Sequence, residues 1–212
     1  CPLVMRAPCS GGIRALEHHS ESMEALYIHV PGLKVVVPST PYDAKGLLVS
    51  SIRDNDPVMF FEPSKLYRAF KEEVPEALFA IPLGEASIRQ EGFDVTLVTW
   101  GTMVRPSIDA AAQSGKSVEV IDLRTLSPWD KNAVLTSVQK TGRLVIVHEA
   151  PLTGGFGAEI AATVASEAMF DLKGPIERVT GYDTPMPLAK REDFYIPTPR
   201  RILKAVEKVS QY

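Results

Sequence analysis

The stretch LKVVVPSTPYDAKGLLVSSIRDNDPVMFFEP, Leu33–Pro63, decides the fold class. Its first part, LKVVVPS, and its last part, PVMFFEP, are short and almost wholly apolar, as expected of strands buried on both faces of a parallel sheet. Between them, Thr40 is a good helix N-cap and Pro41 suits the first helical position, so TPYDAKGLLVSSIRD predicts a helix. A strand, a helix and a strand in this order indicate a doubly wound α/β fold with right-handed crossovers.

The same alternation returns in the second part of the chain. Buried strands are predicted by DVTLVTW (94–100), SVEVIDLR (117–124) and RLVIVHEA (143–150), with IERVT (176–180) as the last. Four helices are predicted between and after these strands. The first covers about 104–114, and the second lies in LSPWDKNAVLTSVQKT with an N-cap near Asp130. The third covers FGAEIAATVASEAMFDL, and the fourth is the amphipathic TPRRILKAVEKVSQY. A second α/β unit is therefore expected.

The periodicity weakens between the two parts, from Ser64 to Glu91. There, KEEVPEA followed by AIPLGEA is charged, is interrupted by proline and has no clear amphipathic face. Such a stretch indicates a linker between domains. We expect a first domain over 1–75, a linker over 76–91 and a second domain over 92–212.

Composition restricts the class of protein. The chain has 212 residues, of which 45% are hydrophobic, and a formal net charge of −3. Charges of both signs are spread along the chain, which gives no footprint for nucleic acid or for a membrane surface. No apolar run approaches the roughly 18 residues that a membrane span needs. Cys1 and Cys9 are too few for a disulfide framework and are not spaced like zinc ligands, so a reducing compartment is expected.

The amino terminus opens inside an apolar strand signal, without an initiator Met and without a secretory segment. We expect this chain to be the carboxy-terminal portion of a longer polypeptide.

RAPCSGGIRALEHHS, Arg6–Ser20, is the best candidate for chemistry. A strand over PLVMR (2–6) leads into Gly11 and Gly12, which let a loop approach a ligand closely. Ser20 is the predicted N-cap of a helix over 20–30, and the apolar face of that helix would carry Met23, Leu26, Tyr27 and Val30.

His19 would then lie at a junction between loop and helix. One ring nitrogen would be free for a substrate and the other for a hydrogen bond that fixes the ring. A surface histidine or a hydrogen-bonded structural histidine is the alternative, and the residues alone favour it.

A glycine motif follows the strand that ends at Ala150. TGGFGAE, Thr153–Glu159, has the position of a dinucleotide-binding loop, but Ile160 stands where the third glycine or alanine is needed. A tight turn for helix packing, or a subunit contact, is the favoured interpretation. His148 and Glu149 end the same strand at the carboxyl edge, where open α/β sheets bind ligands, although a structural role is the stronger hypothesis.

Asp54, Asn55 and Asp56 follow a predicted helix, where a carboxylate gains nothing from the helix dipole. Their oxygens could bind a hard cation together with backbone carbonyls. A solvated turn is the favoured alternative.

Several blocks together resemble one known family. HHSES, HVPGLKVVVPSTPYDAKGLL, IRDNDPV, VIDLRTLSPWD, KTGRLVIVHEAPLTGGFGAEI and GYDTPMP are similar, in order, to blocks of the β subunit of the thiamine-diphosphate-dependent decarboxylating component of 2-oxo acid dehydrogenase complexes. FFEPSKLYR and HEAPLTGGF resemble the branched-chain (2-oxoisovalerate) type more than the pyruvate type. The resemblance covers the whole chain.

This resemblance implies the end of a transketolase-like pyrimidine-binding domain followed by a transketolase carboxy-terminal domain, each a largely parallel sheet flanked by helices. It implies a heterotetramer of two α and two β subunits. Thiamine diphosphate would be shared with the α subunit, which would also hold Mg, and the cofactor-activating glutamate would lie upstream of Cys1. The chain alone is therefore expected to be inactive. The implied compartment is the mitochondrial matrix in a eukaryote or the cytoplasm in a prokaryote.

The same resemblance assigns individual residues. His19 matches the family's active-site histidine, which reverses the interpretation from the residues alone, whereas His18 receives no role. A structural K site would take ligands from the positions Cys1, Leu3, Val4, Ser51, Asp54 and Asp56. Tyr212 would contact the subunit-binding domain of the lipoyl acyltransferase, on a surface formed by the second domains of both β subunits.

Three alternatives remain open. The chain could belong to a pyruvate or acetoin dehydrogenase β subunit, or it could be a non-catalytic assembly module, since its second domain carries no cofactor motif. A nicotinamide-binding Rossmann domain is the third alternative, and the failed glycine pattern disfavours it.

Overall fold

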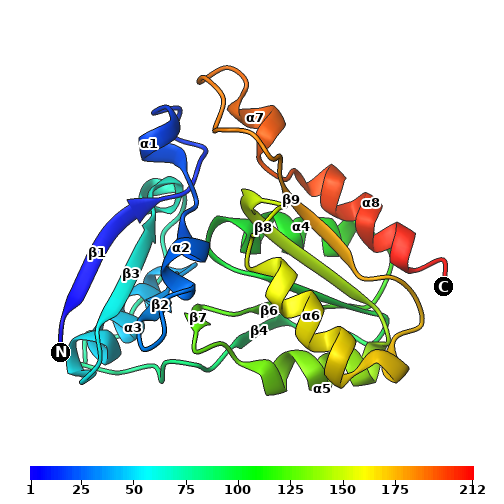
Figure 1. The fold of residues 1–212 in the computed structure, drawn as a ribbon, viewed down its shortest axis with the longest axis horizontal. Helices are drawn as coiled ribbons and strands as arrows, with labels where there is room; N and C mark the ends of the chain where they lie inside the picture. The colour runs from blue at the N-terminus through cyan, green and yellow to red at the C-terminus, as the bar shows by residue number, and fades with distance from the viewer.

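Two sheets lie next to each other, each flanked by helices (Figure 1). The computed structural model describes the backbone of residues 1–212 and all side chains except those of Glu17 and His18. The side chain of His18 in the motif HHSES therefore lies outside the described part.

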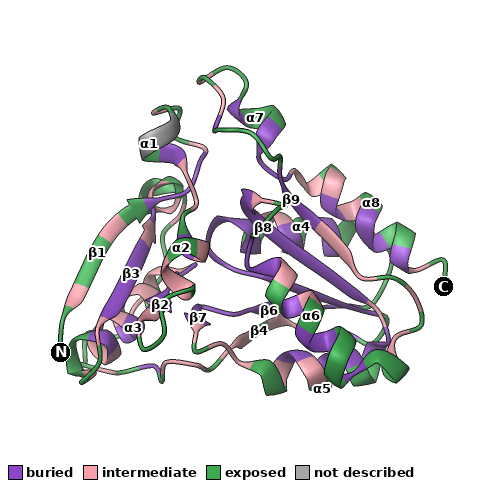
Figure 2. Cartoon of the chain, viewed as in Figure 1, coloured by how far each residue is buried: buried purple, intermediate pink, exposed green. Residues whose placement is uncertain are grey.

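The first sheet has the strand order β1-β3-β2-β7. Its strands are β1 (Val4–Cys9), β2 (Lys34–Val36), β3 (Val58–Pro63) and β7 (Thr125–Ser127). β1, β3 and β2 run parallel, whereas β7 pairs antiparallel with β2. The helix α3 (Pro41–Arg53) packs on this sheet by burying Leu47 against Val36 and Phe60. Figure 2 shows β3 as buried and β1 as largely exposed along its length.

The second sheet has the order β4-β6-β5-β8-β9. Its strands are β4 (Ser87–Gln90), β5 (Val95–Thr99), β6 (Val118–Asp122), β8 (Leu144–Pro151) and β9 (Glu177–Gly181). All are parallel to their neighbours except β4, which runs antiparallel to β6. The expected α/β class, with mostly parallel sheets flanked by helices, is confirmed.

Helices cover both faces of the second sheet. α4 (Val104–Gln113) and α8 (Pro199–Val209) share one apolar core, and α5 (Lys131–Thr141) and α6 (Gly157–Glu167) contribute to another. The second core also contains residues of the first sheet, among them Val35, Met59 and Phe61, so one hydrophobic cluster joins both sheets. The remaining short elements are α1 (Glu17–Ser20), α2 (Glu24–Ile28), α7 (Glu192–Tyr195) and three 3₁₀ turns, Ser64–Arg68, Gly101–Met103 and Met169–Asp171.

Two helix starts agree with the capping chemistry of the sequence. The Thr40 hydroxyl accepts a hydrogen bond from the backbone N–H of Asp43 at 3.1 Å, and Pro41 occupies the first position of α3. Asp130 caps α5 in the same way, because its carboxylate accepts from the N–H of Ala133 at 3.0 Å. Each cap satisfies a backbone donor that the helix itself leaves free.

The predicted helix over 20–30 is wrong in extent and in orientation. Ser20 is the last residue of α1 instead of an N-cap, and α2 begins only at Glu24. The expected apolar face is largely solvent-exposed at Met23, Leu26 and Val30, whereas the carboxylate of Glu24 is buried. Glu24 accepts a hydrogen bond from the Trp100 indole at 3.2 Å, and this contact between distant segments outweighs local periodicity.

Two strands lie outside the predicted pattern. β7 follows β6 after two residues and is absent from the prediction, because its three residues lack the run of apolar residues that marks the other three-residue strand, β2. β4 occupies 87–90, within the predicted linker, and pairs with β6 of the second sheet. The proposed division at 76–91 itself stays a prediction.

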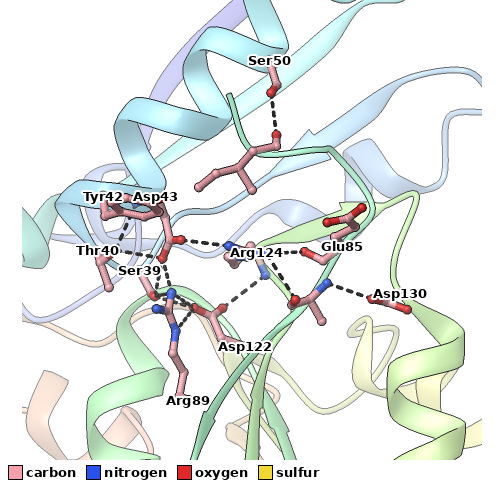
Figure 3. A network of polar contacts seen from close by, with 12 residues as sticks. Ser39, Thr40, Tyr42, Asp43, Ser50, Glu85, Arg89, Asp122, Arg124 and Asp130 are labelled. Atoms are coloured by element: carbon pink, nitrogen blue, oxygen red, sulfur yellow. Dashed lines mark hydrogen bonds and ion pairs between the residues drawn. The ribbon is translucent and has the colours of Figure 1, made fainter. Parts of the chain in front are cut away.

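A buried ionic network, which we call the Asp43 network, joins α3 to the second sheet (Figure 3). The carboxylates of Asp43 and Asp122 are fully buried. Arg124 donates to Asp43 at 3.1 Å, and Arg89 lies between the two carboxylates, 2.9 Å from that of Asp122. Burial raises the pKa of Asp122, and the Arg89 guanidinium opposes that effect.

Candidate functional site

The candidate site is the loop that follows β1 at the carboxyl edge of the first sheet. We call residues 10–21, which include α1 and His19, the histidine loop. The backbone N–H of Ser10 donates to the carbonyl of Glu21 at 3.1 Å and so closes the loop at its base. His19 is exposed on α1. Carboxyl edges of parallel sheets are where open α/β proteins bind ligands, so the position of His19 is suited to contact with a substrate.

The histidine loop has an unusual backbone. Three non-glycine residues have positive φ angles, namely Ser10 at 72°, Arg14 at 59° and Leu16 at 70°, and Gly12 has a φ of 91°. Such conformations cost about 1–3 kcal/mol each for residues other than glycine, and they persist where the surrounding structure fixes them. The surroundings of this loop must therefore supply specific contacts.

Glu149, at the end of β8, supplies the first set of contacts. Its Oε2 accepts from the N–H of Gly11 at 2.8 Å and from the hydroxyl of Ser22 at 3.3 Å, and its Oε1 accepts from the hydroxyl of Thr102. Burial raises the pKa of Glu149 to about 7, although the hydrogen bonds from Thr102 and Gly11 favour the ionised form. Glu149 thus contacts residues at both ends of the histidine loop.

Glu192, on α7, supplies the second set. Its Oε1 accepts from the N–H of Gly12 at 2.7 Å and its Oε2 accepts from the N–H of Arg14 at 2.8 Å. Only 1% of Glu192 is exposed. A separate ion pair on the surface joins the guanidinium of Arg14 to Asp193 at 3.1 Å.

The absence of a side chain at Gly11 permits this close approach. A Cβ atom at Gly11 would lie 2.9 Å from Ile196 Cδ1 and 3.0 Å from Met186 Cε. Glycine at this position therefore allows the histidine loop to pack directly against the second unit of the chain.

A cavity of about 640 Å³ opens beside the end of the histidine loop. Its wall contains Glu21 and Ser22 from that end, Glu149 from β8 and Tyr195 from α7, and Met23 and Leu26 contribute apolar surface. Burial raises the pKa of Tyr195 to about 12, so its hydroxyl is protonated at neutral pH. The cavity is large enough for a small organic molecule.

His148 has a packing role. It is fully buried, it stacks on Trp100 with 5.2 Å between ring centroids, and burial lowers its pKa to about 4, so the ring is neutral at physiological pH. A Cβ atom at Gly155 or at Gly157 would lie 2.7 Å from an atom of this ring. The glycines of TGGFGAE therefore allow close packing against β8, as the interpretation of a tight turn expected.

The residues predicted for a monovalent cation already have partners. Asp54 and Asp56 pair with the ammonium of Lys34 at 2.6 and 3.2 Å, and the Ser51 hydroxyl donates to the carbonyl of Leu47 at 2.8 Å. The carbonyl of Leu3 accepts from the N–H of Val58 at 2.8 Å. The cation site with ligands from Cys1, Leu3, Val4, Ser51, Asp54 and Asp56 stays a prediction.

The part of the chain with described side chains also lacks a cluster of three His, Cys, Asp or Glu residues that could hold a metal ion. Among the described helices, none is both long enough and apolar enough to cross a membrane.

Tyr212 lies far from the histidine loop, at the other end of the second unit (Figure 1). Its side chain is half exposed, and its ring lies against Gly174, where a Cβ atom would come within 2.7 Å of the ring. The two predicted functional residues, His19 and Tyr212, therefore belong to separate surfaces.

Of the two carboxylates that contact the histidine loop, the sequence pointed to Glu149 at the carboxyl edge of a strand, with a structural role favoured, and did not point to Glu192. The position of Glu149 at the carboxyl end of a buried strand was a usable signal, but the sequence did not indicate its partners. Glu192 lies in KREDFYIPTP, where nothing distinguishes it from neighbouring charged residues.

Comparisons with known proteins match both parts of the chain. The transketolase C-terminal domain family matches residues 84–202 and the transketolase pyrimidine-binding domain family matches residues 1–69. The chain is 53% identical to 2-oxoisovalerate dehydrogenase subunit beta 2, mitochondrial, of Arabidopsis thaliana, over 99% of this chain and 59% of that protein. It is 47% identical to a pyruvate dehydrogenase E1 component subunit beta of Acholeplasma laidlawii, over 99% of this chain and 65% of that protein.

A solved structure, described as a split gene transketolase in an inactive beta4 tetramer, has the same fold. Its TM-score is 0.80 at 25% identity, and the similarity covers 98% of this chain and 66% of that chain. The chain thus spans less than two thirds of the length of the curated relatives named above.

Proposed function

Because the chain belongs to the transketolase family through its pyrimidine-binding and C-terminal domains, we propose that it is part of a β subunit of a 2-oxo acid dehydrogenase. The observation that carries this proposal is the histidine loop, which presents His19 at the carboxyl edge of the first sheet. Relatives of both the branched-chain and the pyruvate type support the general activity.

Thiamine diphosphate, when bound, supplies a carbanion that adds to the 2-oxo carbon and an electron sink for the loss of carbon dioxide. We propose that the cofactor lies between this subunit and an α subunit that holds Mg. His19 would contact the substrate and hold or move a proton at an imidazole nitrogen. The loop around it would orient the ring and help to exclude water.

The proposed substrate class is branched-chain 2-oxo acids. The motifs FFEPSKLYR and HEAPLTGGF support this choice. The test is to co-express the full-length β subunit with its α partner and to compare turnover of 3-methyl-2-oxobutanoate and pyruvate. Faster turnover of pyruvate would overturn the branched-chain assignment, and turnover of neither acid would overturn the enzyme assignment.

Tyr212 is proposed to contact the lipoyl acyltransferase. Aromatic rings that are half exposed and held in place by packing are suited to anchor an interface, and the ring of Tyr212 is held against Gly174. Deleting Gln211 and Tyr212 should weaken binding of the subunit-binding domain by about tenfold, because a truncated anchor residue costs more than 1 kcal/mol. Calorimetry at matched salt measures this change.

The deletion should leave decarboxylation with an artificial electron acceptor unchanged, because the carboxy terminus lies far from α1, the helix that contains His19 (Figure 1). Glu207→Ala, an exposed change on α8, serves as the control for binding. Equal affinity of the deletion variant and the unchanged protein would remove Tyr212 from the interface.

A further inference from the structure

We propose that Glu149 and Glu192 are positioning residues that fix the histidine loop and, through it, the location of His19. The inference rests on the proposed function, because it explains how residues of the second domain hold His19, the proposed catalytic residue of the first domain, in place. Neither carboxylate needs to touch the substrate in this role. Each acts on the backbone of the segment that carries the histidine.

The hydrogen bonds divide the task between the two carboxylates. Glu149 accepts from Gly11 at the start of the loop and from Ser22 just after its end, so it holds the base of the loop. Glu192 accepts from the N–H groups of Gly12 and Arg14, so it holds the first half of the loop. Together they account for three backbone donors within four residues.

Both carboxylates are almost fully buried, with 4% of Glu149 and 1% of Glu192 exposed. Burial of a carboxylate is unfavourable unless hydrogen bonds compensate, and hydrogen bonds to an ionised acceptor are among the stronger ones in proteins. The loop supplies these donors, and in return the carboxylates hold backbone conformations with positive φ at Ser10, Gly12 and Arg14. Loss of either carboxylate would let this segment relax to other conformations.

The two residues also come from different elements of the second unit. Glu149 lies near the carboxyl end of β8, which lies inside the second sheet, whereas Glu192 belongs to α7. In Figure 1, α1 and α7 approach each other from the two units. The location of His19 is therefore set by the packing of the second unit and not by the first sheet alone.

The test uses the full-length β subunit assembled with its α partner. Glu149→Ala and Glu192→Ala should each lower kcat by about 10- to 100-fold with less effect on KM, because small displacements of a reacting group cost rates of this order. Asp193→Ala removes the surface ion pair with Arg14 but leaves the backbone contacts, so it is the matched control and should change kcat less than twofold. A decrease in kcat of the same size in all three variants would contradict the proposal.

Glutamine substitutions separate positioning from general damage. In Glu149→Gln the amide oxygen can accept from Gly11 and Ser22, while the amide nitrogen donates to the Thr102 hydroxyl. The kcat of this variant should therefore be much closer to that of the unchanged enzyme than the kcat of Glu149→Ala is. In Glu192→Gln the amide nitrogen must face one of two backbone N–H donors, so one hydrogen bond is lost and activity should stay low. Equal behaviour of the two glutamine variants would overturn the assigned contacts.

A double-mutant cycle tests whether the effect passes through His19. The decrease caused by Glu149→Ala should shrink to less than about threefold when His19 is already Ala, because coupled residues are not additive. If Glu149→Ala lowers activity by the same factor with and without His19, Glu149 does not act through His19.

Hydrogen exchange gives a readout that does not depend on the enzymatic assignment. Peptides that cover 9–22 should exchange faster in Glu149→Ala and Glu192→Ala, while peptides from β5 and β6 should keep their protection. Unchanged exchange over 9–22 would refute the positioning role even if the enzyme is active. Faster exchange in a protein that decarboxylates neither acid would retain the contacts and refute only the proposed function.

Discussion

Replacing His19 with Ala in the full-length β subunit, assembled with its α partner, should lower overall turnover by about 10² to 10⁴-fold. This is the usual contribution of a positioned acid or base. The fold should survive, because the His19 side chain is exposed and its removal opens no cavity in the core. Steady-state kinetics, thermal unfolding and cofactor affinity, measured on the same preparation, separate a catalytic loss from a structural one.

His29→Ala is the matched control for this experiment. His29 is also exposed and also lies close to a short helix, at the end of α2, but it is outside the histidine loop. Its replacement should leave turnover within about twofold. If His19→Ala turns over substrate almost as fast as the unchanged enzyme, His19 is an ordinary surface histidine. This is the interpretation that the residues alone favoured.

The elements that could be predicted from sequence are those whose signals are local. α3 has a capping threonine, a proline at its first position and an apolar strand on each side, and all of these act within a few residues. The helix expected over 20–30 had an apolar periodicity and a predicted N-cap at Ser20, but Ser20 ends α1 instead. There the contact of Glu24 with Trp100, 76 residues away, decides which face is buried.

The contacts of the histidine loop could not be predicted for the same reason. Gly11 and Glu149 are 138 residues apart, and Gly12 and Glu192 are 180 residues apart. Periodicity gives the direction in which a side chain points from its own element, but it gives no information on which loop of another element meets it. His19 was selected only by resemblance. Glu149 lies within one of the motifs that carry that resemblance, HEAPLTGGF, but the motif does not indicate which loop it contacts, and Glu192 lies outside all of these motifs.

Contacts between the two units have two distinct characters. Close to the histidine loop, carboxylates of the second unit accept hydrogen bonds from backbone N–H groups of the loop. In the Asp43 network, by contrast, charged side chains pair with each other in the interior. The first arrangement sets a loop conformation, and the second sets how strongly the units are held together.

Replacing Arg89 with Met should lower the free energy of unfolding by about 3–5 kcal/mol, the range for a buried ion pair that loses one partner. Arg89 is the guanidinium between Asp43 and Asp122, and both carboxylates are fully buried. Asp43 keeps its contact with Arg124, whereas Asp122 loses its only cationic partner among the described side chains. Urea unfolding, followed by the fluorescence of Trp100 and Trp129, measures the change.

Arg6→Met is the matched control. Arg6 lies on the largely exposed strand β1 and pairs with Glu62 of β3, so its loss should lower the free energy of unfolding far less. Asp122→Asn, added to Arg89→Met, should recover part of the loss, because a neutral amide does not need the guanidinium. A loss that is no larger than that of Arg6→Met would mean that water reaches Asp122 and that the network does not hold the units together.

The pH dependence of Arg89→Met follows from the buried carboxylate. Burial raises the pKa of Asp122 even with Arg89 present, and removal of the guanidinium should raise it further. The native state of the variant then binds a proton at a pH where the unfolded chain has released it, so its stability decreases as pH rises through that interval. The deficit relative to the unchanged protein should therefore be largest at neutral pH and shrink toward pH 5. A deficit that is constant from pH 5 to pH 8 would show that lost packing of the Arg89 side chain, rather than the uncompensated charge of Asp122, is the cause.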